Sequence, residues 1–213
     1  MTQTHLFREA QEAAETVRLQ LRTNTEIMER LGERLRRHRP YAVVTCARGS
    51  SDHAATFAKY LIETRLGILT SSAAPSVSSV YAAKADLRGT VMLAISQSGA
   101  SPDLLATVAS AKSAGAMIVA LVNVETSPLA QAADYTIALC AGREQSVAAT
   151  KSYIAALAAI IHLVAFWAQD EELFSQFRIL ASQGQLVESA GLTYPVEGTV
   201  GPISEASDDQ KKQ

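Results

Sequence analysis

Apolar residues recur every three to four positions from residue 6 to residue 39, which is the spacing of one face of an α-helix. Pro40 should end this helix, because a proline ring cannot continue the hydrogen-bonded turn. Arginines gather in the expected last turn, where positive charge complements the helix dipole. The pattern therefore predicts one long N-terminal helix within residues 1–40.

After Pro40, short apolar runs alternate with segments of helical spacing. Helices are expected over residues 51–66, 102–114 and 147–169, the last of them very apolar. The apolar runs cover residues 41–46, 68–72, 90–95, 117–122 and 135–139. Continuous apolar strands separated by helices are typical of a parallel sheet that is buried on both faces. Right-handed crossovers then place helices on both sides, so the sequence predicts a doubly wound α/β fold with a five-stranded parallel sheet.

The chain is expected to divide into three parts. The N-terminal helix covers residues 1–40, the α/β domain covers residues 41–182, and a tail covers residues 183–213. The tail lacks periodicity and ends in polar and charged residues, so we expect it to be irregular and partly disordered.

Composition and charge narrow the class of protein. Of the 213 residues 48% are hydrophobic, which is enough for a buried core, and the net charge of −2 gives no electrostatic reason to expect nucleic acid. Glutamates alternate with the arginines of the N-terminal helix, which disfavours a nucleic-acid-binding arm. Cys46 and Cys140 lack metal-ligand spacing and read as reduced thiols.

No membrane or export signal is expected either. The first residues are polar and acidic, unlike a signal peptide, and the most apolar stretch, residues 153–168, is shorter than the ~20 residues that a membrane span needs. We therefore expect a soluble, cytoplasmic protein that binds neither nucleic acid nor membranes.

Two loops carry the strongest chemical signal. In a parallel sheet, ligands bind at the carboxyl ends of strands, and residues 47–53 and 96–103 follow two of the expected strands. Both loops combine glycine with small hydroxyl residues and lead into helix N-termini, where unpaired amides and the helix dipole favour an anion. Helix capping by Ser50, Ser51 and Ser101 is the alternative interpretation, but two such loops on neighbouring strands favour an anion site. Neither loop fits a GxGxxG or Walker A motif, so nucleotide binding is disfavoured.

A third loop, residues 141–153, places Glu144 and Lys151 on either side of a helix start. A carboxylate beside a sugar phosphate could move a proton between adjacent carbons, as an aldose–ketose interconversion requires. Alternatively, Glu144 stabilises the helix N-terminus and Lys151 packs or is solvated. His53 and His162 are expected to be packed rather than catalytic, with His162 in the core.

Three segments together resemble a known family. Residues 96–103 (SQSGASPD), 49–54 (GSSDHA) and 144–153 (EQSVAATKSY) look like the motifs of sugar isomerase (SIS) domains. The resemblance covers residues 6–170. It is strongest to the isomerase half of glutamine–fructose-6-phosphate aminotransferase and to stand-alone amino-sugar phosphate deaminase/isomerase relatives.

The resemblance implies a flavodoxin-like SIS fold and a set of ligand contacts. The phosphate of a hexose or amino-hexose 6-phosphate would bind to Ser96, Gln97, Ser98 and Ser101. Ser50 and Ser51 would meet the phosphate or the sugar hydroxyls, and the backbone of Val147, Ala148 and Ala149 would contact the sugar. Ala100 and Ala149 depart from residues frequent in the family, which implies a narrower or different substrate.

The implied activity is an aldose–ketose isomerase or an amino-sugar phosphate deaminase. It would act through an enediol, with Glu144 as the base and with no metal or organic cofactor. The resemblance further implies that close relatives carry two SIS domains in tandem, with the proton-transfer glutamate and histidine in the second. A homodimer of this chain is therefore expected to rebuild a composite site. The chain starts Met-Thr and its first cysteine is Cys46, so glutamine-dependent amination is not expected. A non-catalytic sugar-phosphate-binding module, or a truncated half of a tandem enzyme, remains the alternative.

Overall fold

The structure is a computed structural model that describes residues 4–74, 85–146 and 148–183. Its described residues form one all-parallel sheet in the order β2-β1-β3-β4-β5. The strands are β1 (Ala42–Ala47), β2 (Leu69–Ser72), β3 (Thr90–Ser96), β4 (Met117–Val122) and β5 (Tyr135–Ala138). The predicted five-stranded parallel sheet is confirmed, and the order reverses between β1 and β3.

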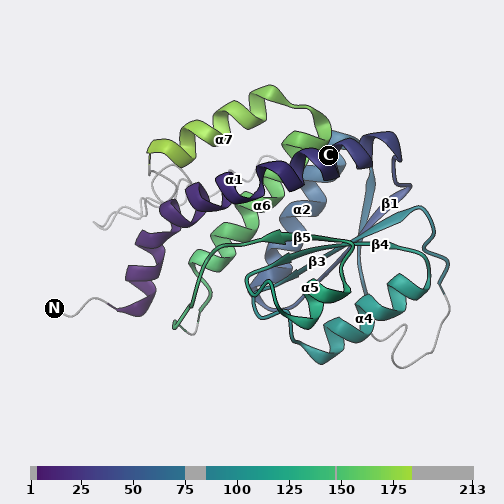
Figure 1. The fold of residues 1–213 in the computed structure, drawn as a ribbon, viewed down its shortest axis with the longest axis horizontal. Helices are drawn as coiled ribbons and strands as arrows, with labels where there is room; N and C mark the ends of the chain where they lie inside the picture. The colour runs from purple at the N-terminus through teal and green to yellow at the C-terminus, as the bar shows by residue number, and fades with distance from the viewer. Residues whose placement is uncertain (1–3, 75–84, 147, 184–213) are drawn as a thin grey trace, which may run out of the picture.

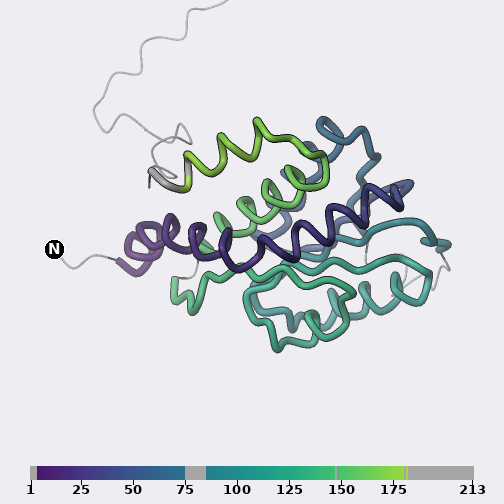
Figure 2. The backbone as a smooth tube through the Cα atoms, turned by 45° about the horizontal axis from the view of Figure 1, so that its top comes forward, coloured from purple at the N-terminus to yellow at the C-terminus, as the bar shows by residue number. Residues whose placement is uncertain are grey.

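Helices cover both faces of the sheet (Figure 1). They are α1 (His5–Arg37), α2 (Ser50–Leu66), α4 (Pro102–Ser113), α5 (Pro128–Ala132), α6 (Lys151–Ala168) and α7 (Glu171–Gln183). α2 and α6 pack on one face, with α1 along α6, and α4 and α5 pack on the other. α7 lies outside this layer against α6 and α1, as a second view shows (Figure 2). The fold is therefore doubly wound, as predicted.

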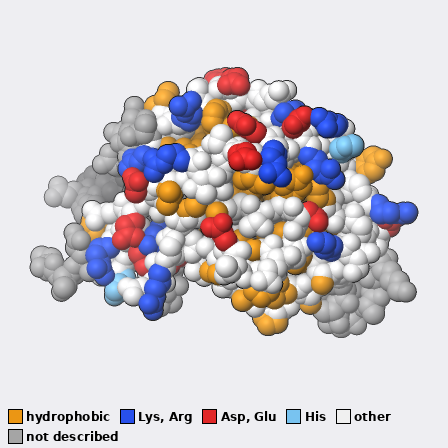
Figure 3. Space-filling model, viewed as in Figure 1, with side chains coloured by type: hydrophobic (Ala, Val, Ile, Leu, Met, Phe, Trp, Pro, Cys, Tyr) orange, Lys and Arg blue, Asp and Glu red, His pale blue; other side chains and the backbone are white. Residues whose placement is uncertain are grey.

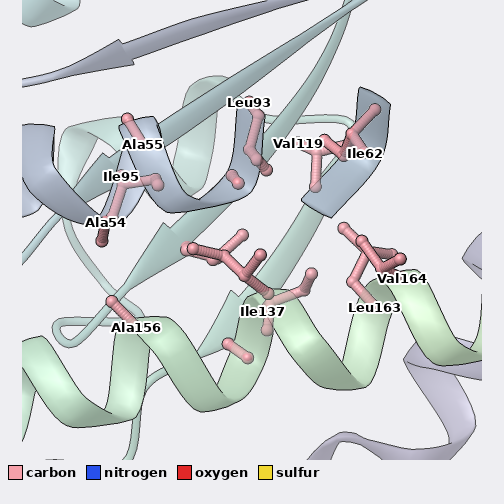
Figure 4. Packing of buried hydrophobic residues seen from close by; sticks show 14 of the residues in the cluster. Ala54, Ala55, Ile62, Leu93, Ile95, Val119, Ile137, Ala156, Leu163 and Val164 are labelled. Atoms are coloured by element: carbon pink, nitrogen blue, oxygen red, sulfur yellow. The ribbon is translucent and has the colours of Figure 1, made fainter. Parts of the chain in front are cut away.

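The sheet divides the core into two halves. On one face Leu93, Ile95 and Val119 pack against α2 and α6 (Figure 4). On the other face, Met92 and Ile118 pack against α4 and α5. Because neighbouring residues of a strand point to opposite faces and both faces are covered, the central strands β3 and β4 are nearly continuous apolar runs.

α1 approaches α6 closely along its length. A Cβ at Gly32 would lie 3.0 Å from the backbone of Phe166, so only glycine permits this approach without a shift. The long helix predicted from the apolar spacing is confirmed, and its bounds are His5–Arg37.

The apolar helix α6 has the length and composition of a membrane span, but 67% of that window is buried inside the structure. Such burial is what a core helix of a globular domain shows, and it fits the expectation that this segment is not a membrane span.

Three features of the helices differ from the predictions. α6 begins at Lys151 rather than at residue 147, and the short helix α5 and the helix α7 were not predicted. The tail expected over residues 183–213 falls, from residue 184 on, outside the described residues. The three-part division of the chain stays a prediction.

Candidate functional site

The loops after β1 and β3 meet the start of α6 at the carboxyl edge of the sheet, around a cavity of about 350 Å³. The cavity lies where the strand order reverses, which is the usual ligand position in such a sheet. Seven residues predicted from the sequence line it, namely Ser50, Ser51, Ser96, Gln97, Ser98, Ser101 and Ala149. Arg48, Ser152 and Tyr153 line it as well and were not predicted.

The loop after β3 is shaped by Gly99, whose φ is 62°. A Cβ there would lie 2.2 Å from the Ser127 hydroxyl oxygen, so no other residue fits without a shift. The Gly99 amide donates to the Ser96 hydroxyl oxygen at 3.0 Å, and the Ala100 amide donates to that of Ser98 at 3.3 Å. Each hydroxyl thus accepts a bond from the loop and keeps its own hydrogen to donate.

The capping interpretation of the serines does not match the helix starts. Ser101 occupies the N-cap of α4, but its side chain makes no capping hydrogen bond. α2 has Gly49 at its N-cap, again with no side-chain cap, and Ser50 is its first residue. The N-terminal amides of both helices therefore lack the serine caps that the alternative interpretation required.

An ion pair joins the two serine loops at the rim of the cavity. The Arg48 guanidinium binds the carboxylate of Asp103 in the first turn of α4, and both side chains are about half exposed. The Leu104 amide, and to a smaller extent Arg48, hold the pKa of Asp103 below its usual value. Because the pair is exposed, it contributes little to stability, but it places a cation beside the hydroxyl groups.

Glu144 caps α6 rather than lining the cavity. Its carboxylate accepts hydrogen bonds from the Thr150 amide at 2.9 Å, the Thr150 hydroxyl at 3.1 Å and the Ser152 amide at 3.2 Å. The Ser152 hydroxyl donates to its other oxygen. This geometry matches the stabilising role that the sequence left open for Glu144, and its catalytic role stays a prediction.

Two further acidic residues reach this loop from α1. Glu9 accepts hydrogen bonds from the backbone amides of Gln145 and Ser146 and from the Ser146 hydroxyl. These bonds hold the pKa of Glu9 below its usual value, although burial alone would raise it. Glu12 forms a 2.6 Å ion pair with Lys151, whose side chain is buried.

Sequence reasoning missed both of these residues. The sequence could have indicated Glu9, because polar residues interrupt the apolar face of α1. The structure shows that three of them, Glu9, Gln20 and Asn24, are buried.

Those of the remaining predicted residues that the structure describes are not among the residues that line the cavity. Ala148 is exposed on the same loop but is not among the lining residues, and Val147 lies outside the described residues. His53 is exposed on α2, so the expectation that it is packed was wrong. His162 is fully buried, which confirms it as a core histidine.

The thiol of Cys46, at the end of β1, is shielded from solvent. Cys46 is buried, and burial raises the pKa of its thiol to about 11, so it stays protonated at neutral pH. No group of three or more histidine, cysteine, aspartate or glutamate side chains that could hold a metal ion is found within residues 4–74, 85–146 and 148–183.

A larger cavity, of about 540 Å³, lies between α1, α6 and α7. Figure 3 shows the face that α1 and α7 cover, with acidic, basic and hydrophobic side chains interspersed. Acidic residues outnumber basic ones along the cavity, which is lined by Glu29, Glu33, Asp170 and Glu171 but only by Arg30 and Arg36. The cavity therefore suits an anion less well than the serine loops do.

Comparison with known proteins agrees with the motifs. A model of the SIS domain family matches residues 38–165. The glutamine–fructose-6-phosphate aminotransferase [isomerizing] of Symbiobacterium thermophilum is 32% identical over 174 residues, which are 79% of this chain and 28% of that protein. The predicted resemblance to SIS domains is thus confirmed.

Solved structures give the same fold. A protein from Silicibacter pomeroyi DSS-3, proposed to be a phosphosugar isomerase, superimposes with a TM-score of 0.85 at 39% identity, over 91% of this chain and 58% of that one. The C-terminal domain of glucosamine-fructose-6-phosphate aminotransferase from Francisella tularensis gives 0.71 at 22% identity, over 87% and 55%, a likeness of fold alone. In each match the chain spans less than two thirds of the relative's length.

Proposed function

The chain belongs to the SIS domain family, and on this premise we propose that it binds a hexose or amino-hexose 6-phosphate in the cavity at the carboxyl ends of β1 and β3. The observation that carries the proposal is the loop after β3, where hydroxyl groups surround the start of α4 and leave its N-terminus without a serine cap. An anion is the ligand chemistry that such a helix start favours.

The phosphate is assigned to the loop after β3. Ser96 and Ser98 each accept a hydrogen bond from an amide of their own loop, which leaves the hydroxyl hydrogen for a ligand oxygen. Ser101 at the N-cap of α4 and the exposed Gln97 amide add donors. The dipole of α4 supports the negative charge without a lysine.

The sugar is assigned to the opposite wall. Ser50 and Ser51 at the start of α2 would bond to the phosphate or to the sugar hydroxyls, and the backbone of Ala148 and Ala149 would contact the ring. The backbone of Val147 is proposed to contact the ring as well.

For the chemistry, we propose an aldose–ketose isomerisation or deamination of the open-chain sugar. A base removes the proton from the carbon next to the carbonyl, and the resulting enediol is reprotonated on the adjacent carbon. With an amino sugar the intermediate is an enaminol, whose reprotonation gives an imine that water hydrolyses to the ketose and ammonia. If Glu144 is that base, it must first leave its hydrogen bonds to Thr150 and Ser152. A cytoplasmic homodimer in which the partner copy brings the base to the cavity avoids this cost.

A second candidate is favoured by the same contacts. The carboxylate of Glu144 is used as a helix cap, so the chain can bind a sugar phosphate without turning it over. In that case the protein is a binding module whose ligand is the same.

Binding is tested first, by calorimetric titration with fructose 6-phosphate and glucosamine 6-phosphate. Ser98→Asp places a carboxylate in the phosphate position and should abolish binding through charge repulsion. Ser110→Asp adds the same charge on the exposed face of α4 and should leave binding unchanged. Failure of the unmodified protein to bind either sugar phosphate, or equal loss in both variants, contradicts the proposal.

Turnover separates the two candidates. An enzyme that forms an enediol in D₂O exchanges the proton of the carbon next to the carbonyl for deuterium, which NMR of the sugar phosphate detects. Deuterium incorporation that is lost in Glu144→Gln, with binding retained, would assign the base to Glu144. Binding without any incorporation favours the binding module.

A further inference from the structure

The face of α1 that contacts the α6 side of the domain carries polar groups where a helix of this kind buries apolar ones. Glu9 is 5% exposed, and Gln20 and Asn24 are buried as well. A buried carboxylate is costly unless its oxygens accept hydrogen bonds, so the partners of Glu9 show what it does.

Those partners all belong to the loop that precedes α6. Glu9 accepts from the amides of Gln145 and Ser146 and from the Ser146 hydroxyl. The Ser146 hydroxyl oxygen also lies 2.8 Å from the carbonyl oxygen of Ala148. A hydroxyl has one hydrogen, so Ser146 donates either to Glu9 or to Ala148, whereas its amide and that of Gln145 tie the loop to α1 just before the segment that we assign to the sugar.

The other end of the loop is held from the same helix. Lys151 is the first residue of α6, where a positive charge is disfavoured by the helix dipole, and its side chain is 7% exposed. Glu12, one turn after Glu9, offsets both costs with its 2.6 Å ion pair. The two residues that follow Lys151, Ser152 and Tyr153, line the cavity.

We propose that Glu9, assisted by Glu12, is a positioning residue of the sugar-phosphate site: α1 holds Gln145, Ser146 and Lys151 in a clamp, so that the start of α6 closes one wall of the cavity. Glu9 does not line the cavity and acts only through the loop. The loop after β3 has no hydrogen bond to Glu9 among the described contacts. The clamp therefore sets the affinity for the sugar and not that for the phosphate group.

The role of Glu9 in sugar binding rests on the proposed function, whereas the contacts of Glu9 with the loop do not. The test therefore has two arms. The first arm measures amide hydrogen exchange in the full chain with Glu9→Gln, which keeps the side-chain length but removes the charge. Exchange of the Gln145 and Ser146 amides should rise roughly tenfold, the size expected for losing hydrogen bonds to a charged acceptor. Exchange in α4 should not change.

The second arm compares two probes. In Glu9→Gln the affinity for fructose 6-phosphate should fall roughly tenfold, while that for inorganic phosphate stays within about twofold of the unmodified protein. Glu15→Gln is the matched control, because Glu15 lies on the exposed side of α1 and its ion pairs, within the described part of the chain, are with arginines of its own helix. It should change neither readout.

Unchanged exchange at Gln145 and Ser146 in Glu9→Gln overturns the clamp. An equal loss of affinity for fructose 6-phosphate and for inorganic phosphate overturns the positioning role, since Glu9 would then support the structure of the whole domain. If Glu9→Gln does not fold, Glu12→Gln takes its place. This variant breaks the ion pair with Lys151, and it must change amide exchange and the two affinities in the same directions, by smaller factors. If the unmodified protein binds neither probe, the proposed function fails and the exchange arm still decides the clamp.

Discussion

At the scale of single residues, the site depends on small side chains that leave the backbone exposed to a ligand. Gly99 has a φ of 62°, and its Cα faces the Ser127 side chain so closely that a Cβ would overlap it. Gly142 has the same φ of 62°, but apart from its two chain neighbours no heavy atom of the described residues lies within 4 Å of the position that a Cβ would take. Comparing the two glycines therefore distinguishes the cost of a positive φ, which both positions share, from the cost of a steric overlap, which only position 99 of the two has.

Gly99→Ala should lower the free energy of unfolding by more than Gly142→Ala does. Both variants carry the strain of a positive φ, about 1 kcal/mol or more, and only Gly99→Ala adds the overlap with Ser127. Urea unfolding measures both, and calorimetry should show that Gly99→Ala also weakens sugar-phosphate binding. Equal destabilisation of the two variants would mean that the close approach to Ser127 is unimportant.

The site residues that the sequence predicted share one property: their signal is local. Glycine and serine directly after an apolar run indicate a ligand loop, and Ser50, Ser96 and Ser98 were predicted on that basis and line the cavity. Glu9 and Gln145 are 136 positions apart. Their contact depends on how α1 docks against the domain, which no local pattern encodes.

At the scale of helices and strands, the strands were predicted with bounds within one residue of those observed. The signal was strongest for β3 and β4, which are buried on both faces, and weakest for the edge strand β2, in which only Thr70 is buried. The start of α6 was set too early. Glu144 accepts hydrogen bonds from the Thr150 and Ser152 amides where α6 begins at Lys151, and Ala148 and Ala149 before it are not helical.

The helix α7 was missed although its signal was present. Phe174 and Phe177 lie one turn apart and face α6, where both contact the ring of His162. Asp170 caps the helix through a 2.9 Å hydrogen bond from the Leu173 amide. Residues 171–182 were placed in the α/β domain, but no helix was assigned to them.

The packing of α7 on α6 should make the protein acid-sensitive through His162. The ring is fully buried, stacks on Phe174 at 5.7 Å between centroids, and burial lowers its pKa to about 4. Because the unfolded chain then binds a proton that the folded chain does not, the stability contributed by neutral His162 is lost as the pH falls from about 6.5 towards 4.

His162→Phe should remove this loss, which amounts to about 3 kcal/mol when complete. The measurement is the free energy of unfolding in urea at pH 7 and at pH 4.5 for the variant and the unmodified protein. His53→Phe is the control, since His53 is exposed. An acid-induced loss in His162→Phe as large as in the unmodified protein would contradict the role of this ring.

At the scale of the whole molecule, α1 is the element that ties the parts together. It packs along α6, contacts the sheet through Asn24, whose amide donates to the Ala138 carbonyl at 2.7 Å, and reaches the candidate site through Glu9. Gln20 donates to the carbonyls of Leu139 and Ala155. The side chains of α1 thus form hydrogen bonds with the backbone at the edge strand β5 and in α6, although residues 1–40 were expected to form a separate part of the chain.

A chain that starts at Pro40 should therefore not fold stably. Val17, Met28, Leu31 and Leu35 are at most 1% exposed. Burying each contributes about 1.5–3 kcal/mol, and together they match the roughly 5–15 kcal/mol that stabilises a typical domain. Circular dichroism and thermal unfolding of residues 40–213 test this, and a cooperative transition near that of the full chain would show that α1 is a separate unit.

The central claim is that the sugar phosphate lies at the carboxyl edge of β1 and β3. Amide chemical shifts of the ¹⁵N-labelled protein during titration with fructose 6-phosphate and glucosamine 6-phosphate test it most directly. We predict that the shifts concentrate in residues 49–51, 96–101 and 148–153. Shifts confined to the cavity between α1, α6 and α7, or no shifts with either sugar phosphate, would contradict it.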